Sequence, residues 1–343
     1  MKIAYILYPE VVVSNRSNGI RSQAVSWANI LKSLGHDVEL VNNWGDYDWK
    51  TFDVIHLFGS GGSWVKNVLK RLSVINPNVV ISPIIDPLQT ESFFLQKIRA
   101  NTGRYTKNLV NTNDSLVRCG LDYGKIVLAR SAYEKEHLIK VYGINQKKIE
   151  IIPLSYSKGY SEYVAENYIK ENFCFHVSSI YQERKNVIRL VRAARKYNFH
   201  LVLAGNKGSE TDFAPLKKEI DLSNNVEVLG FVSEKEKIEL YKKAKVFALP
   251  STQEGVGIVA LDAALFGCEI AMTNIPGPKE YYGNQCLLFN PYNVDEIGKS
   301  IRLLLDGEVS FQPELKKYID KKFSESRIGQ DLISAYKKAV GND

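Results

Sequence analysis

A chain of 343 residues is longer than one hydrophobic core usually requires and suits two domains of ordinary size. Its 45% hydrophobic and 24% charged residues are typical of a folded globular protein, and no apolar run approaches the roughly 20 residues of a membrane-spanning helix. The four cysteines have no metal-like or redox-like spacing, which predicts free thiols in a cytoplasmic protein.

The net charge of +7 is unevenly distributed. Residues 66–149 hold 14 Lys and Arg against 6 Asp and Glu, whereas the rest of the chain is nearly balanced. This excess indicates either a solvated basic surface or attraction to an anionic membrane surface or a phosphate-bearing acceptor. A nucleic-acid partner is disfavoured, because aromatic residues are not interleaved with the basic ones in a recognisable pattern.

The first half of the chain alternates between strand-like and helix-like segments. The start, KIAYILY, predicts a first strand and not a signal peptide, because Pro9 and Glu10 interrupt the apolar run. Residues 21–36 predict a helix with one apolar face made of Ala24, Trp27, Leu31 and Leu34. Further short strands are predicted at residues 37–42, 53–59, 78–84 and 125–130.

The second half repeats this pattern. Strands are predicted at residues 173–179, 199–206, 225–232 and 245–251, and helices at 186–198 and 236–244. Such alternation is typical of parallel sheets with helices on both faces. We therefore expect an α/β protein with two doubly wound domains that share a cleft beyond the carboxyl ends of their strands. The polar stretch 155–172 is the expected link between the domains.

A glycine-rich turn joins a predicted strand to a predicted helix in STQEGVGIVALDAALFGCEI, residues 251–270. The spacing of Ile258, Leu261 and Leu265 predicts a buried helix that begins near Gly257. A strand, a glycine turn and a helix start form an arrangement that binds anions through free backbone N–H groups. Because an acid beside an anion repels it, Glu254 just before this helix is expected to bind something other than a phosphate.

Residues 231–274, FVSEKEKIELYKKAKVFALPSTQEGVGIVALDAALFGCEIAMTN, resemble the signature region of the retaining glycosyltransferases of family 4, which have the GT-B fold. That family carries two glutamates separated by seven residues, and this chain has Glu254 and Asp262 at those places. LAGNKG and VEVLGFVS match two further family segments in the expected order. The resemblance implies a GT-B architecture of two Rossmann-like domains facing across a cleft.

The resemblance also implies the domain boundaries. Residues 1–155 would form an N-terminal, acceptor-side domain, and residues 156–325 a C-terminal domain that binds a nucleotide-sugar donor. Residues 326–343 would form a C-terminal helix that crosses back to the N-terminal domain.

By resemblance, Glu254 would bind hydroxyls of the transferred sugar, and Asp262 those of the ribose, because carboxylates accept hydrogen bonds from hydroxyls. Lys185 would neutralise the leaving diphosphate, and a cation ~4 Å away contributes roughly 4 kcal/mol at an effective dielectric near 20. Glu254 and Lys185 are therefore the predicted catalytic residues. The implied donor contacts are Gly19, Ser179, Arg184, Phe231, Val232, Gly255, Val256, Gly257, Ile258 and Asp262.

This chain departs from the family pattern at one place. Ser178 and Ser179 stand where the family has glycine and arginine, so Arg184 or Arg21 would have to supply the second positive charge. Arg21 and Asp86 are the acceptor-side candidates. His56 lies within a predicted strand and is interpreted as a core residue.

The implied reaction is the transfer of a hexose from a nucleotide-diphosphate sugar to a glycan or lipid-linked saccharide, with retention of configuration, in surface polysaccharide synthesis. The chain has no DxD-like motif beside a strand, so neither a metal nor a cofactor is expected. The expected location is the cytoplasm, with a possible peripheral contact to the inner face of the membrane through residues 66–149.

Two alternatives remain open from the sequence. One is a non-catalytic protein that binds sugar nucleotides, which the missing arginine favours. The other is a GT-B sugar-nucleotide epimerase, although 5 histidines are few for that chemistry. A nicotinamide dehydrogenase is disfavoured, because no G-x-G-x-x-G motif follows the first strand.

Overall fold

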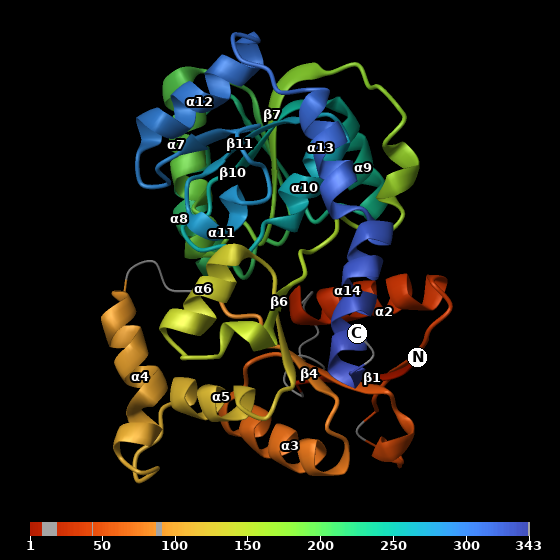
Figure 1. The fold of residues 1–343 in the computed structure, drawn as a ribbon. Coiled ribbons are helices and arrows are strands. Elements are labelled where there is room, and N and C mark those ends of the chain that lie inside the picture. Colours follow the sequence, from red (N-terminus) through yellow and green to blue (C-terminus); the bar gives the residue numbers. More distant parts are fainter. Residues whose placement is uncertain (9–18, 43, 87–90, 342–343) are drawn as a thin grey trace. The chain divides into compact units, whose positions relative to one another are not determined.

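The computed structural model describes residues 1–8, 19–42, 44–86 and 91–341 (Figure 1). The chain forms two compact units, one of Met1–Ser155 with Glu325–Asp343 and the other of Tyr156–Ser324. Each unit contains a six-stranded sheet, and the paired strands are parallel throughout. The predicted α/β class with two Rossmann-like doubly wound domains is confirmed.

The first sheet has the spatial order β2–β1–β3–β4–β5–β6. Its strands are β1 (Lys2–Leu7), β2 (Asp37–Leu40), β3 (Val54–Phe58), β4 (Val79–Ser82), β5 (Ile126–Ala129) and β6 (Ile149–Ile151). The helices of this unit are α2 (Gly19–Ser33), α3 (Gly62–Ile75), α4 (Phe93–Tyr105), α5 (Asn113–Leu121), α6 (Ala132–Lys140) and α14 (Glu325–Val340). Short 3-10 helices lie at η1 (Trp49–Thr51) and η2 (Gln146–Lys148).

Helices on both faces bury the central strands completely, which explains why β3, β4 and β5 read as continuous apolar runs. The predicted apolar face of α2 is confirmed for Ala24, Trp27 and Leu31, which are buried. It is wrong for Leu34, whose exposed fraction is 43%. The reason is that α2 ends at Ser33, and the left-handed φ of 81° at Gly35 turns the chain toward β2.

Helix α14 belongs to the first unit, although it is the last helix of the chain. The hydroxyl of Tyr336 lies 2.8 Å from the hydroxyl of Tyr5 on β1 and 2.7 Å from Nδ1 of His56 on β3. Nε2 of His56 lies 2.8 Å from Oγ of Ser82 on β4. This buried polar network attaches α14 to three strands. It also confirms that His56 is a core residue, with burial lowering the pKa of its imidazole well below the usual value.

The second sheet has the spatial order β12–β11–β10–β7–β8–β9. Its strands are β7 (Glu171–Val177), β8 (Leu201–Ala204), β9 (Val226–Gly230), β10 (Ala244–Leu249), β11 (Glu269–Thr273) and β12 (Leu287–Phe289). Its helices are α7 (Val187–Tyr197), α8 (Glu210–Ile220), α9 (Glu234–Lys243), α10 (Ile258–Leu265), α11 (Pro276–Lys279), α12 (Val294–Asp306) and α13 (Glu314–Phe323). The 3-10 helices are η3 (Tyr160–Tyr163) and η4 (Glu183–Lys185).

The strand order of the second sheet reverses direction between β7 and β10. From β7 the chain moves outward through β8 to β9, then returns to β10 on the other side of β7 and continues through β11 to β12. In doubly wound sheets this reversal opens a crevice beyond the carboxyl ends of the two central strands, where ligands bind. The loops after Val177 and Leu249 therefore border the expected binding site of this unit.

The four cysteines are free, as their spacing predicted, and three of them are buried in the second unit. The expected link at residues 155–172 is shorter than predicted at its far end, because β7 already begins at Glu171. The link also contains η3, so it is not a wholly irregular segment.

Candidate functional site

Two loops meet at the reversal point of the second sheet. The first runs from the end of β7 through η4 to α7, and the second runs from the end of β10 to α10. The backbone N–H of Thr252 donates to the carbonyl of Arg184 at 2.9 Å, which joins the two loops directly. The side-chain amide of Asn186 donates to the carbonyls of Pro250 and Pro291 at 2.9 and 2.6 Å. These buried bonds fix the β7 loop against the end of β10.

An ion pair lies where these loops meet. Nζ of Lys185 is 2.6 Å from Oε2 of Glu254, and the two side chains are only 14% and 16% exposed. The hydroxyl of Ser251 donates to the same carboxylate oxygen at 3.2 Å. Within the described part of the chain, no hydrogen bond reaches the other oxygen, Oε1 of Glu254. The ammonium group of Lys185 also retains two further hydrogens, since it has three donors.

The buried side chain of His176, on β7, supports the loop that follows this strand. Nδ1 of His176 lies 2.8 Å from the carbonyl oxygen of Ala248, and Nε2 lies 2.8 Å from Oγ of Ser178. A carbonyl can only accept, so Nδ1 carries the proton and Nε2 accepts from the Ser178 hydroxyl. Burial, with a smaller effect from the positive charge of Lys185, lowers the pKa of His176 to about 4. The ring is therefore neutral near pH 7 and keeps Ser178 in one orientation.

Glycines allow the close backbone approaches of the site. Gly257 has a left-handed φ of 76° directly before α10, and a Cβ there would lie 2.5 Å from Cδ2 of Leu249. Gly205, with a φ of 119°, lies so close to the β7 loop that a Cβ would be 1.8 Å from the carbonyl oxygen of Ser178. A side chain at either position would force the backbone apart.

The remaining residues of the predicted turn are arranged around Gly257. Val256 is buried, whereas Gly255 and Ile258 are half-buried. The carbonyl of Gly255 lies 2.5 Å from the position that a Cβ on Gly277 of α11 would take, so α11 supports the turn from behind. The helix α10 begins at Ile258, as the apolar spacing predicted.

Asp262 is placed differently from the other predicted donor residues. It lies in the second turn of α10, as expected, but its side chain is buried. Both carboxylate oxygens accept hydrogen bonds from Ser157, Oδ1 from the backbone N–H at 2.8 Å and Oδ2 from the hydroxyl at 2.7 Å. Burial raises the pKa of Asp262 to about 6, although the bonds from Ser157 oppose this effect.

Four further predicted donor residues lie on loops or helix starts. Ser179 is half-buried in the β7 loop, and its carbonyl accepts from the N–H of Gln182 at 3.0 Å. The side chain of Arg184 is exposed. After β9, Phe231 is 88% exposed and Val232 is half-buried.

The other predicted residues belong to the first unit. Gly19 is the first residue of α2, with open space where its side chain would be, and Arg21 is exposed in the first turn of that helix. Asp86 forms an ion pair with Arg130 at 2.8 Å. Arg130 is buried and also pairs with Glu134 at 2.9 Å, which makes Asp86 one part of a structural network.

Sequence reasoning did not identify Ser157, His176, Asn186 or Ser251 as contributors to this site. His176 and Ser178 are separated by one residue, so an extended backbone directs both side chains to the same side, and this spacing was a usable signal. Ser157 contacts Asp262 across 105 residues of sequence, and Asn186 contacts Pro250 across 64. No local sequence pattern predicts either contact.

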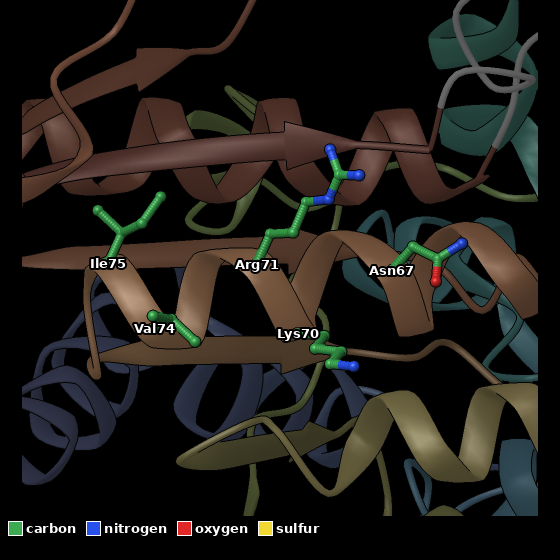
Figure 2. A pocket seen from close by; sticks show the side chains of 5 residues that line it. All are labelled: Asn67, Lys70, Arg71, Val74 and Ile75. Carbon is green, nitrogen blue, oxygen red and sulfur yellow. The ribbon is translucent and has the colours of Figure 1, made fainter.

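A surface pocket lies along α3 in the first unit and not at the loops described above. It is lined by Asn67, Lys70, Arg71, Val74 and Ile75 (Figure 2). Among the described residues, no group of three or more His, Cys, Asp and Glu side chains is arranged to hold a metal ion. None of the helices in the described ranges combines the length and apolar character needed to cross a bilayer.

Two doubly wound parallel sheets, with an ion pair and a glycine turn at the reversal point of the second, define the class of two-domain GT-B proteins. Residues 162–322 match the family model described as "Glycosyl transferases group 1". The predicted resemblance to glycosyltransferase family 4 is therefore confirmed, and this part of the second unit is similar to the group 1 glycosyltransferases.

Curated relatives agree with this assignment. The chain is 24% identical to the O-antigen chain mannosyltransferase B of Escherichia coli over 253 residues, which cover 68% of this chain and 66% of the relative. It is 26% identical to the O-antigen chain mannosyltransferase RfbU of Salmonella typhimurium over 60% of this chain and 55% of the relative. The chain thus spans between about half and two thirds of the length of these relatives.

Solved structures show the same fold. A sucrose-phosphate synthase of Thermosynechococcus elongatus has a TM-score of 0.73 at 15% identity, with both chains covered completely. Anabaena HepE, solved in complex with UDP-glucose, has a TM-score of 0.70 at 16% identity, covering 98% of this chain and 100% of that one. At these identities the likeness supports the GT-B fold alone.

Proposed function

We propose that this protein is a glycosyltransferase that transfers a hexose from a nucleotide-diphosphate sugar to a saccharide or lipid-linked saccharide in the synthesis of a surface polysaccharide. The observation that carries the proposal is the Lys185–Glu254 pair at the reversal point of the second sheet. The names of the O-antigen mannosyltransferases to which the chain is similar support the choice of product. The complex of HepE with UDP-glucose supports the choice of donor.

In this proposal, Glu254 and Lys185 contact different parts of the donor. Oε1 of Glu254 accepts hydrogen bonds from the hydroxyls of the transferred sugar. Lys185 keeps its bond to Oε2 and directs its other hydrogens at the diphosphate, whose negative charge grows as it leaves. The N–H groups at Gly255, Val256, Gly257 and Ile258 lie at the start of α10, where the helix dipole favours the same negative charge.

We also propose that transfer retains the configuration of the sugar and needs no metal ion. The acceptor hydroxyl forms its bond to the anomeric carbon on the face that the diphosphate leaves, and its proton passes to the departing phosphate oxygen. Lys185 then provides the positive charge that a divalent ion would otherwise supply. Arg184 is proposed to add a second charge, because it directly precedes Lys185 and is exposed beside it.

The proposal is tested by ligand binding followed by turnover. We expect the melting temperature to rise with one of UDP-, GDP- or ADP-linked hexoses, because a ligand at 100 times its Kd stabilises by about 2.7 kcal/mol. With that donor and a saccharide acceptor, nucleoside diphosphate should be released, with or without EDTA, and NMR should show a product of unchanged anomeric configuration. Binding without turnover would instead indicate a non-catalytic sugar-nucleotide-binding protein. The presence of Ser179 where the family has arginine favours that alternative.

We further propose that the first unit contacts an anionic membrane surface through α4. This helix and the turn after it expose large apolar side chains, with Phe94 71% and Leu95 51% exposed. Lys97, Arg104 and Lys107 are exposed along the same segment. Apolar side chains that enter the headgroup region, together with basic residues at about 1 kcal/mol each, suit an interfacial helix.

Sedimentation with vesicles tests the membrane contact. We expect the protein to bind vesicles containing anionic phosphatidylglycerol more tightly than neutral phosphatidylcholine vesicles. Replacing Phe94 and Leu95 together by serine should weaken that binding by at least about tenfold, because each large apolar side chain contributes roughly 1.5–3 kcal/mol on burial. Leu222→Ser is the matched control, since Leu222 is 63% exposed in the second unit. Equal loss with the control would refute a specific role of α4.

A further inference from the structure

Both carboxylate oxygens of Asp262 accept hydrogen bonds from one residue of this chain. Ser157 donates to Oδ1 through its backbone and to Oδ2 through its hydroxyl, at 2.8 and 2.7 Å. Ser157 lies near the start of the segment that connects β6 to β7, only two residues after the boundary between the two units. The acid of α10 and the connecting segment, here residues 156–170, are thus joined by a two-point contact across 105 residues of sequence.

The connecting segment is hydrogen-bonded to the rest of the second unit at several further points. The hydroxyl of Tyr156 donates to Asp320 at 2.9 Å, and the hydroxyl of Tyr160 donates to Glu234. The ammonium group of Lys316 donates to carbonyls farther along the segment. The Asp262 contact is therefore one anchor of a segment that follows the surface of this unit along its length.

The surroundings of Asp262 leave no surface for a ligand. The residue is 1% exposed, so a ribose cannot reach the carboxylate without displacing the connecting segment. An aspartate at this position is one methylene shorter than the glutamate of the family pattern, which keeps the carboxylate close to α10. Lys237 and Glu234 of α9 also act on this carboxylate, with opposite signs. The two bonds from Ser157 compensate for burying its charge.

We propose that Asp262 is a positioning residue for the connecting segment and does not bind the ribose of the donor. The inference rests on the proposed function, because it concerns how that site recognises the ribose of the donor nucleotide. It has a consequence for specificity. The 2′-hydroxyl of the donor is not recognised by Asp262, so removing that hydroxyl and altering Asp262 have independent effects on binding.

Calorimetric titration of UDP, GDP, ADP and their 2′-deoxy counterparts tests this consequence. Wild type, Asp262→Asn and Ser157→Ala are each titrated with the ribonucleotide that wild type binds and with its deoxy form. We expect the ratio of the two Kd values to agree within twofold among the three proteins. The inference is wrong if Asp262→Asn reduces that ratio fivefold or more while Ser157→Ala leaves it unchanged, which is the result for a carboxylate that binds ribose.

A melting experiment tests the positioning role without any ligand. Asp262→Asn and Ser157→Ala should each lower the melting temperature, and the double variant should lose less than the sum of the two decreases, because both single variants disturb the same bond between the Ser157 hydroxyl and the carboxylate. Ser209→Ala, which removes an exposed helix cap in the same unit, should add to Asp262→Asn. Additive decreases for Ser157 and Asp262 would overturn the inference. If wild type binds none of UDP, GDP and ADP, the proposed donors are refuted, and this experiment still decides the role of Asp262.

Discussion

Replacing Lys185 by alanine is expected to lower kcat by about 10²–10³, by analogy with the loss of other groups that stabilise charge in a transition state. The physical reason is that Lys185 is the partner of Glu254 at 2.6 Å and is 14% exposed, so its charge acts in a partly desolvated site. The measurement is the rate of nucleoside diphosphate release at saturating donor and acceptor. A single cooperative melting transition of the variant would show that its fold is intact.

Two controls separate this role from a general effect of charge. Lys217→Ala removes a lysine from an ion pair with Asp221 on the surface of the same unit, where both side chains are about 60% exposed, and should leave kcat unchanged. The double variant Lys185→Ala with Glu254→Ala should lose much less than the product of the two single losses, since the residues act as a pair. Wild-type turnover by Lys185→Ala would show that the diphosphate role is wrong.

Replacing Gly205 by alanine is expected to destabilise the second unit by about 3 kcal/mol or more, which corresponds to roughly 6–12 °C in melting temperature. A Cβ at this position would lie 1.8 Å from the carbonyl oxygen of Ser178, and the φ of 119° is also unfavourable for alanine. The backbone has to move, because the added Cβ and the carbonyl oxygen of Ser178 are both attached directly to the main chain and cannot rotate away from each other. The movement displaces the β7 loop that carries Lys185, so nucleotide binding should weaken as well.

Gly159→Ala is the matched control for this variant. Gly159 has a left-handed φ of 82° in the same unit, but no atom lies within 4 Å of the position of its Cβ. Only the conformational cost applies there, about 1–2 kcal/mol. Differential scanning fluorimetry of both variants separates the steric part from the conformational part. Equal shifts would mean that the β7 loop can retreat from Gly205 without cost.

Much of the fold follows from local patterns. Alternating strands and helices predict the two doubly wound sheets, because a strand buried on both faces has to be apolar throughout and a covering helix has to keep one apolar stripe. The helix after Gly257 begins where the spacing of Ile258, Leu261 and Leu265 places it. Helix ends were less certain, as Leu34 demonstrates, since a single left-handed glycine ends α2 before its apolar period does.

The candidate site was predictable in part. The resemblance indicated Lys185 and Glu254, which the structure brings into contact, and their roles toward the donor stay a prediction. The contacts of Asp262 were not predictable, because Ser157 lies in a segment that reads only as a polar link. The same limit applies to Asp86, which the sequence offers as a free acid and the structure pairs with Arg130.

Local patterns along the chain were enough to predict the alternation of elements, the glycine turn, the class of protein and the acids that could bind a sugar. These features depend on residue type and on spacing within one element, which local geometry controls. Which acid is accessible to a ligand and which is already hydrogen-bonded within the protein became clear from the folded chain. Long-range contacts join residues from different elements, and burial of a carboxylate between two such elements leaves no trace in the spacing of either one.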